Sequence, residues 1–124
     1  MTGRSEAIHL AVPGRLDQAT GGYIYDRRIV EGLRALGLET PWPRGAFYAF
    51  PRVAPFLDAR GSAGFCEDLL EEQNLAVVPG SAFGVEEHVR FSYATSLDVI
   101  EKALARFAAF LAPRQAQRVS AARR

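Results

Sequence analysis

The stretch from Val77 to Ser96 constrains the fold of this chain most strongly, because it combines an apolar run, a tight turn and a strand that carries a charge. The apolar run enters the turn Pro79-Gly80-Ser81. The strand that follows alternates between two kinds of side chain, which is typical of a strand with two unlike faces. Its apolar members are Val89, Phe91 and Tyr93, and its polar members are His88, Arg90 and Ser92.

Arg90, in the middle of this strand, predicts an anion as its partner. Charged side chains are rare inside alternating apolar strands unless they are paired. The planar guanidinium suits a carboxylate, which it can hold through two parallel hydrogen bonds. The alternative is a structural ion pair or a place at a sheet edge, which is the commoner role of a lone strand arginine.

The remaining periodicity predicts three helices and two more strands. Apolar residues at intervals of three or four predict a helix from Tyr23 that stops near Gly37. A second helix is expected over 62–73 with Ser62 as its N-cap, and a third from Thr95 or Ser96 to the residue before Pro113. The apolar stripe of the third helix is Ile100, Leu104, Phe107 and Leu111. Strands are expected over 46–50 and 75–78.

Two upstream motifs accompany the Val89-Arg-Phe-Ser-Tyr-Ala94 element, namely Tyr25-Asp-Arg-Arg-Ile-Val-Glu-Gly-Leu33 and Gly45-Ala-Phe-Tyr-Ala-Phe-Pro51. In their order and spacing these motifs closely resemble the C-terminal small domain of the pyridoxal-phosphate-dependent class I/II (fold type I) aminotransferases. The resemblance covers roughly residues 22 to 112.

The resemblance implies an α+β fold, a two-layer small domain in which a short sheet is covered by helices. It implies that Arg90 binds the α-carboxylate of the substrate and that Phe47 or Tyr48 lines the substrate side. The implied reaction is amino-group exchange between an amino acid and a 2-oxo acid. Which amino acid reacts is left open, because the residues that set side-chain selectivity lie elsewhere in the family. The chain is expected to divide into a loose N-terminal arm (1–22), the small domain (23–112) and a basic, disordered tail (113–124).

The single lysine decides what this chain can do alone. Transamination needs a lysine that holds the cofactor as a Schiff base and moves the substrate proton. Lys102 lies about 200° around its helix from Ile100 and from Leu104, so it is expected to face water. The chain therefore looks like a fragment of an aminotransferase. We expect no catalytic residue and no bound pyridoxal phosphate in it, and a large catalytic domain in trans as its partner. The alternative is a truncated or repurposed non-catalytic interaction module.

Composition and charge exclude several other classes of protein. A net charge of +1 gives no electrostatic basis for binding nucleic acid or a membrane, and no apolar run approaches the ~20 residues of a membrane span. The single cysteine, Cys66, excludes an intrachain disulfide, is expected to be a packed thiol and fits a cytoplasmic protein. With only His9 and His88, no metal site is expected. Gly80-Ser81 lacks the glycine pattern of a phosphate loop.

Overall fold

The computed structural model describes residues 8–9, 19–43 and 47–122. The elements, in chain order, are β1 (Ile8–His9), α1 (Ala19–Ala35), β2 (Tyr48–Ala49), η1 (Ala54–Phe56), α2 (Gly61–Gln73), β3 (Leu75–Ala76), β4 (Val78–Pro79), η2 (Gly80–Phe83), β5 (Val89–Ser92) and α3 (Leu97–Ala122), where η marks a 3-10 helix. None of the described helices is both long enough and apolar enough to cross a membrane.

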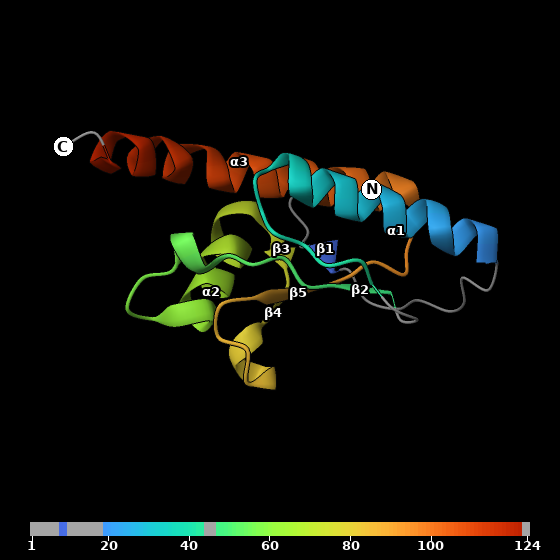
Figure 1. The fold of residues 1–124 in the computed structure, drawn as a ribbon, viewed down its shortest axis with the longest axis horizontal. Helices are drawn as coiled ribbons and strands as arrows, with labels where there is room; N and C mark the ends of the chain where they lie inside the picture. Colours follow the sequence, from blue (N-terminus) through green and yellow to red (C-terminus); the bar gives the residue numbers. More distant parts are fainter. Residues whose placement is uncertain (1–7, 10–18, 44–46, 123–124) are drawn as a thin grey trace.

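The strands form a small sheet with β5 in the middle. Its order is β2-β5-β4 and both pairings are antiparallel, with Tyr48 opposite Ser92 and Val78 opposite Arg90. A second, two-stranded sheet pairs β1 with β3 in parallel. Figure 1 shows α1 and α3 side by side along one side of the strands, with α2 below them. The predicted α+β class with helices over a short sheet is confirmed.

The core lies between the helices and the apolar face of β5. Val89, Phe91 and Tyr93 are fully buried, as the alternation predicted. The ring of Phe91 meets that of Phe107 in α3 with centroids 5.0 Å apart, and Phe65 of α2 meets Phe110 at 5.2 Å. The predicted stripe of α3 is buried throughout. The polar face of β5 is thereby turned away from α3.

The ends of the helices were predicted in part. Gly37 follows α1 with a φ of 86°, and Ser96 caps α3 by accepting a hydrogen bond from the backbone N–H of Val99 at 3.2 Å. The prediction that Ser62 is the N-cap of α2 was wrong. The helix begins earlier, at Gly61, and the Ser62 hydroxyl accepts a hydrogen bond from the backbone N–H of Ser81 at 3.1 Å.

The prediction that Pro113 ends the last helix was also wrong, and residues 114–122, expected to be disordered, are helical. Proline removes one backbone donor and so weakens the helix, but contacts made by the next residue favour its continuation. The side chain of Arg114 donates to the Phe110 carbonyl at 2.9 Å and pairs with Glu72 of α2 at 3.0 Å. These bonds hold the continued helix against α2.

The other differences concern the N-terminal arm and the expected strands. Within the expected arm 1–22, Ile8–His9 form β1 and α1 begins at Ala19, whereas residues 1–7 and 10–18 lie outside the described part. The single strand expected over 75–78 is two strands, β3 and β4, that belong to different sheets. Of the strand expected over 46–50, Tyr48–Ala49 are extended and paired, and Ala46 lies outside the described residues.

Candidate functional site: the polar face of the middle strand

Arg90 lies in the middle strand of the sheet, on the face that the helices leave free. Alternation along β5 places its side chain on the same face as those of His88 and Ser92, opposite the buried Val89 and Phe91. The position is half-buried. The sheet therefore presents a cation on its polar face.

Two aromatic rings hold the guanidinium of Arg90. Its central carbon lies 4.2 Å from the ring centroid of Tyr48 and 4.5 Å from that of Phe83. Such cation–π contacts stabilise a guanidinium without using its N–H donors. No carboxylate among the described residues forms an ion pair with Arg90. The geometry thus differs from that of a structural ion pair.

Three polar atoms on this face are buried and lack a hydrogen-bond partner in the described part of the chain. They are Nδ1 of His88, Nε of Arg90 and Oγ of Ser92. Buried polar groups are nearly always paired, so each of these atoms calls for an explanation. They belong to alternate residues, one just before β5 and two within it, so they lie on the same face of this part of the chain.

Tyr48 and Phe47, the two residues predicted to line the substrate side, point in different directions in the structure. Tyr48 is opposite Ser92 in the sheet and lies against Arg90. Phe47 turns to the core side, where its ring meets the buried Tyr93 edge-on with centroids 5.7 Å apart. The structure thus brings Tyr48 to Arg90 and does not bring Phe47 there.

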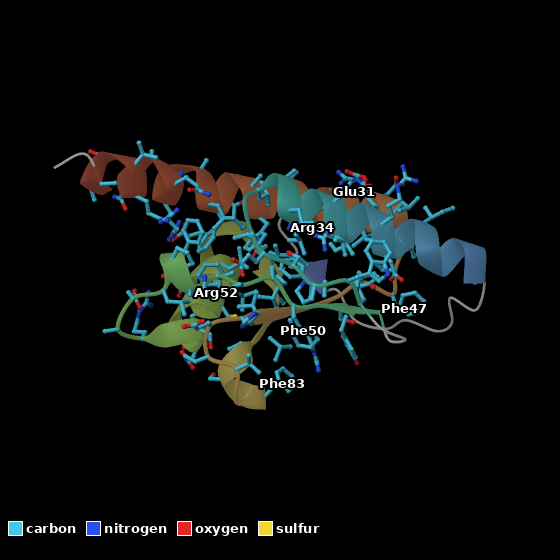
Figure 2. All side chains as sticks on the ribbon, in the orientation of Figure 1. Glu31, Arg34, Phe47, Phe50, Arg52 and Phe83 are labelled. Carbon is cyan, nitrogen blue, oxygen red and sulfur yellow. The ribbon has the colours of Figure 1, made fainter. Side chains whose placement is uncertain are left out.

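Phe83 completes the site and was missed by the sequence analysis. It lies in η2, 44% exposed, and its ring meets that of Phe50 edge-on at 6.4 Å. Figure 2 shows Phe50 and Phe83 on the side of the strands away from α1 and α3. The only sequence signal was an aromatic residue just after the Pro79-Gly80-Ser81 turn.

Gly80 allows the close backbone packing that brings Phe83 to Arg90. Its N–H donates to the carbonyl of His88 at 2.8 Å, and its own carbonyl accepts from Val85 at 2.9 Å. A Cβ at this position would lie 1.9 Å from the carbonyl oxygen of Val85, so no larger residue fits. The segment from Gly80 to His88 thus folds back on itself and returns the chain to β5.

The chain's own residues do not fit a covalent pyridoxal phosphate site. Lys102, the only lysine, is exposed on α3, whereas Arg90 faces away from α3 on the other side of the sheet. Among the described residues there is also no group of three or more side chains suited to a metal ion. Burial raises the pKa of the Cys66 thiol to about 12, which keeps it protonated and unreactive at neutral pH.

The sequence model of the family described as aminotransferase class I and II matches residues 25–107. The chain belongs to this family. The predicted family is thereby confirmed, and it is one whose enzymes use pyridoxal phosphate.

Comparison with individual aminotransferases shows what share of such an enzyme this chain covers. It is similar to the aspartate aminotransferase of Bacillus subtilis (strain 168), with 48% identity over 75 residues, 56% of this chain and 18% of that enzyme. The crystal structure of the Thermotoga maritima aspartate aminotransferase matches with a TM-score of 0.65 at 39% identity, over 73% of this chain and 23% of that one. The aromatic aminotransferase of Pyrococcus horikoshii matches with a TM-score of 0.66 at 39% identity, over 81% and 30%. The chain spans about a fifth of the length of the curated relatives it matches, for example 18% and 22%.

Proposed function

We propose that this chain acts as the C-terminal small domain of an aminotransferase and that Arg90 binds the α-carboxylate of the substrate. The observation that carries the proposal is the half-buried guanidinium, which meets two aromatic rings and no carboxylate of the described chain. A partly desolvated charge without a counter-ion is costly, so the site gains stability when an anion arrives. A carboxylate matches the fork of the guanidinium.

The proposed reaction is amino-group exchange between an amino acid and a 2-oxo acid. Both reactants carry an α-carboxylate, so a single arginine can orient each of them in turn. Relatives include enzymes named for aspartate and for aromatic substrates. The proposal therefore names the shared α-carboxylate and no particular side chain. In this scheme the cofactor and its lysine come from a catalytic domain outside these residues, and the chain alone is inactive.

A chimeric enzyme tests the role of Arg90. The C-terminal segment of the Bacillus subtilis aspartate aminotransferase would be replaced by the matching residues of this chain, and kcat/KM measured. We expect Arg90→Lys to lower kcat/KM by about 10- to 150-fold, which corresponds to about 1.5–3 kcal/mol for a hydrogen bond to a charged group. An ammonium cannot reproduce the two-pronged contact.

Arg52→Lys is the matched control, because Arg52 is already paired with Glu87 at 3.1 Å. It should leave kcat/KM unchanged. Unchanged kinetics in an active Arg90→Lys chimera would remove the carboxylate-binding assignment.

A second test concerns the chain alone. Equimolar pyridoxal phosphate is expected to give no stoichiometric Schiff-base absorption band, because the only lysine, Lys102, is exposed on α3 and lies on the other side of the sheet from Arg90. A stoichiometric band that disappears in Lys102→Ala would contradict this expectation.

The alternative function is a non-catalytic module that binds a protein through the same face. The exposed Phe83 (44%), which lies against Arg90, favours such a contact, and Val85 in the same segment is also exposed (40%). A neighbouring reading frame that encodes a lysine-bearing catalytic domain would support the enzyme. A folded chimera without transaminase activity would support the module.

A further inference from the structure

The segment from Gly80 to His88 is fastened to α2 by two hydrogen bonds that converge on Ser62. The backbone N–H of Ser62 donates to Oε2 of Glu86 at 2.6 Å, and the hydroxyl of Ser62 accepts from the backbone N–H of Ser81 at 3.1 Å. Ser62 is fully buried. Because Ser81 and Glu86 lie near opposite ends of the segment, the two bonds hold its whole length.

Glu86 gives α2 the cap that its own sequence lacks. Arg60, at the N-cap position, makes no side-chain capping bond. The carboxylate of Glu86 satisfies a free N–H of the first turn and carries the charge that a helix N-terminus favours. Gly61 leaves the necessary room, since a Cβ there would lie 1.9 Å from Oε2 of Glu86. Both partners therefore provide for this contact: the segment supplies the carboxylate, and α2 supplies the N–H donor and the space beside it.

The fastened segment also carries Phe83, one of the two rings that hold Arg90. The ring lies 4.5 Å from the guanidinium carbon, and Nε of Arg90 is buried without a partner. The orientation of Arg90 thus depends on where this segment sits. The segment, in turn, is held at Ser62.

We propose that Glu86 is a positioning residue for Arg90: by capping α2 it holds Phe83 against the guanidinium and so presets the direction of the guanidinium before an anion binds. The use of that direction rests on the proposed carboxylate-binding function. The mechanical link from Glu86 through Phe83 to Arg90 does not. The link leaves the N–H donors of Arg90 unused, as a site for a carboxylate requires.

The link can be followed by NMR on the ¹⁵N-labelled chain. The Nε–Hε signal of Arg90, assigned by its loss in Arg90→Lys, reports burial through its exchange with water. Glu86→Ala should raise this exchange rate about fivefold or more, the factor expected for loss of a helix cap. Phe83→Ala should raise it as well. The double variant should add little to either single variant, because both substitutions break the same link.

Conservative and control variants separate positioning from general stability. Glu86→Gln keeps an oxygen acceptor for the Ser62 N–H and should restore most of the protection. Glu87→Gln, at the neighbouring exposed glutamate that pairs with Arg52, should leave the Arg90 signal unchanged. If Glu86→Ala does not fold, Ser62→Ala replaces it, since it removes only the bond from Ser81 and should raise the exchange rate too.

The proposal is overturned if a folded Glu86→Ala, or Ser62→Ala in its place, leaves the Arg90 exchange rate unchanged. Additive effects of Glu86→Ala and Phe83→Ala would overturn it as well. A titration of the wild-type chain with maleate tests the function separately. If maleate does not change the Arg90 signal of the wild-type chain, the carboxylate-binding role is removed. The exchange rates of the variants still test the link from Glu86 through Phe83 to Arg90.

Discussion

The guanidinium of Arg90 is held by the faces of Tyr48 and Phe83, and this has a consequence for binding. An internal ion pair would have to break before a substrate carboxylate could enter, which would cost part of the binding free energy. Aromatic faces fix the plane of the guanidinium and leave its N–H edges free. The arginine is therefore oriented without being neutralised.

Tyr93 gives a pH-dependent prediction at the level of one residue. Burial raises the pKa of Tyr93, and the hydrogen bond from its hydroxyl to Asp26 of α1 raises the pKa further. In the unfolded chain this hydroxyl ionises near ~10, whereas the folded protein keeps it neutral. Above that pH the unfolded state binds fewer protons, so stability should fall as pH rises, by up to about 1.4 kcal/mol per pH unit.

Urea unfolding between pH 8 and 12 measures this alkaline loss of stability, and Tyr93→Phe should flatten it. At pH 7, the difference in the free energy of unfolding between wild type and Tyr93→Phe gives the contribution of the hydrogen bond to Asp26. An alkaline slope that persists in Tyr93→Phe would assign the loss to other groups.

At the residue scale, the sequence predicted the position of Arg90 on the polar face of a strand but not its surroundings. The alternation in 88–93 places a charge on one face of a strand by local geometry alone. The contact with Phe83 depends on how the segment after Gly80 folds back, and the cap from Glu86 joins residues 24 positions apart. No periodic pattern encodes such contacts, since each is set by the packing of separate elements.

Among the elements, α3 shows how tertiary contacts override a local stop signal. Pro113 should end a helix that has nothing to pack against. Here Arg114 reaches Glu72 of α2, and the Gln115 amide donates to the Leu36 carbonyl at the end of α1 at 3.4 Å. The two contacts join the second half of α3 to both other helices. The periodicity of α3 was predicted correctly and its length was not.

Replacing Pro113 should therefore stabilise the protein. Pro113→Ala restores a backbone donor in a helix whose flanking contacts are already made, and the gain in the free energy of unfolding should be up to about 3 kcal/mol. Urea unfolding followed by circular dichroism measures it. Pro55→Ala is the control, because Pro55 lies in the first turn of η1, where proline is tolerated. A destabilised Pro113→Ala would mean that a bend at this position is needed for docking onto α2.

The split between β3 and β4 could not be predicted for a related reason. The run 75–78 is uniformly apolar, so it gives one strand signal with no internal break. Its first half, Leu75–Ala76, pairs with β1, whereas Val78 pairs with β5. Only the positions of those two partners decide where the strand divides.

For the whole molecule, the exposed apolar side chains predict association. Phe83 and Val85 are both exposed, and Phe83 lies against Arg90. In addition, β2 is an edge strand of the described sheet. Apolar patches and open strand edges both favour contact between copies.

Val85→Lys should therefore reduce association of the purified 124-residue chain. Light scattering over a concentration series measures it, and a thermal melt confirms that the variant is folded. Val119→Lys is the control, since Val119 is equally apolar and 53% exposed but lies near the end of α3. A monodisperse wild-type monomer at high concentration would contradict the prediction and would favour an independent binding module.

The strand order β2-β5-β4 also determines when the sheet can form during synthesis. A ribosome releases the chain from its N-terminus at roughly 5–20 residues per second. Both outer strands therefore emerge before the strand that joins them, and they have no partner in the nascent chain while it is still short. The sheet cannot grow strand by strand; it closes in one step once Val89–Ser92 have left the exit tunnel. The helices α1 and α2 also pack against α3, which follows β5 in the chain. Their apolar faces therefore stay open to chaperones until the last helix has left the exit tunnel.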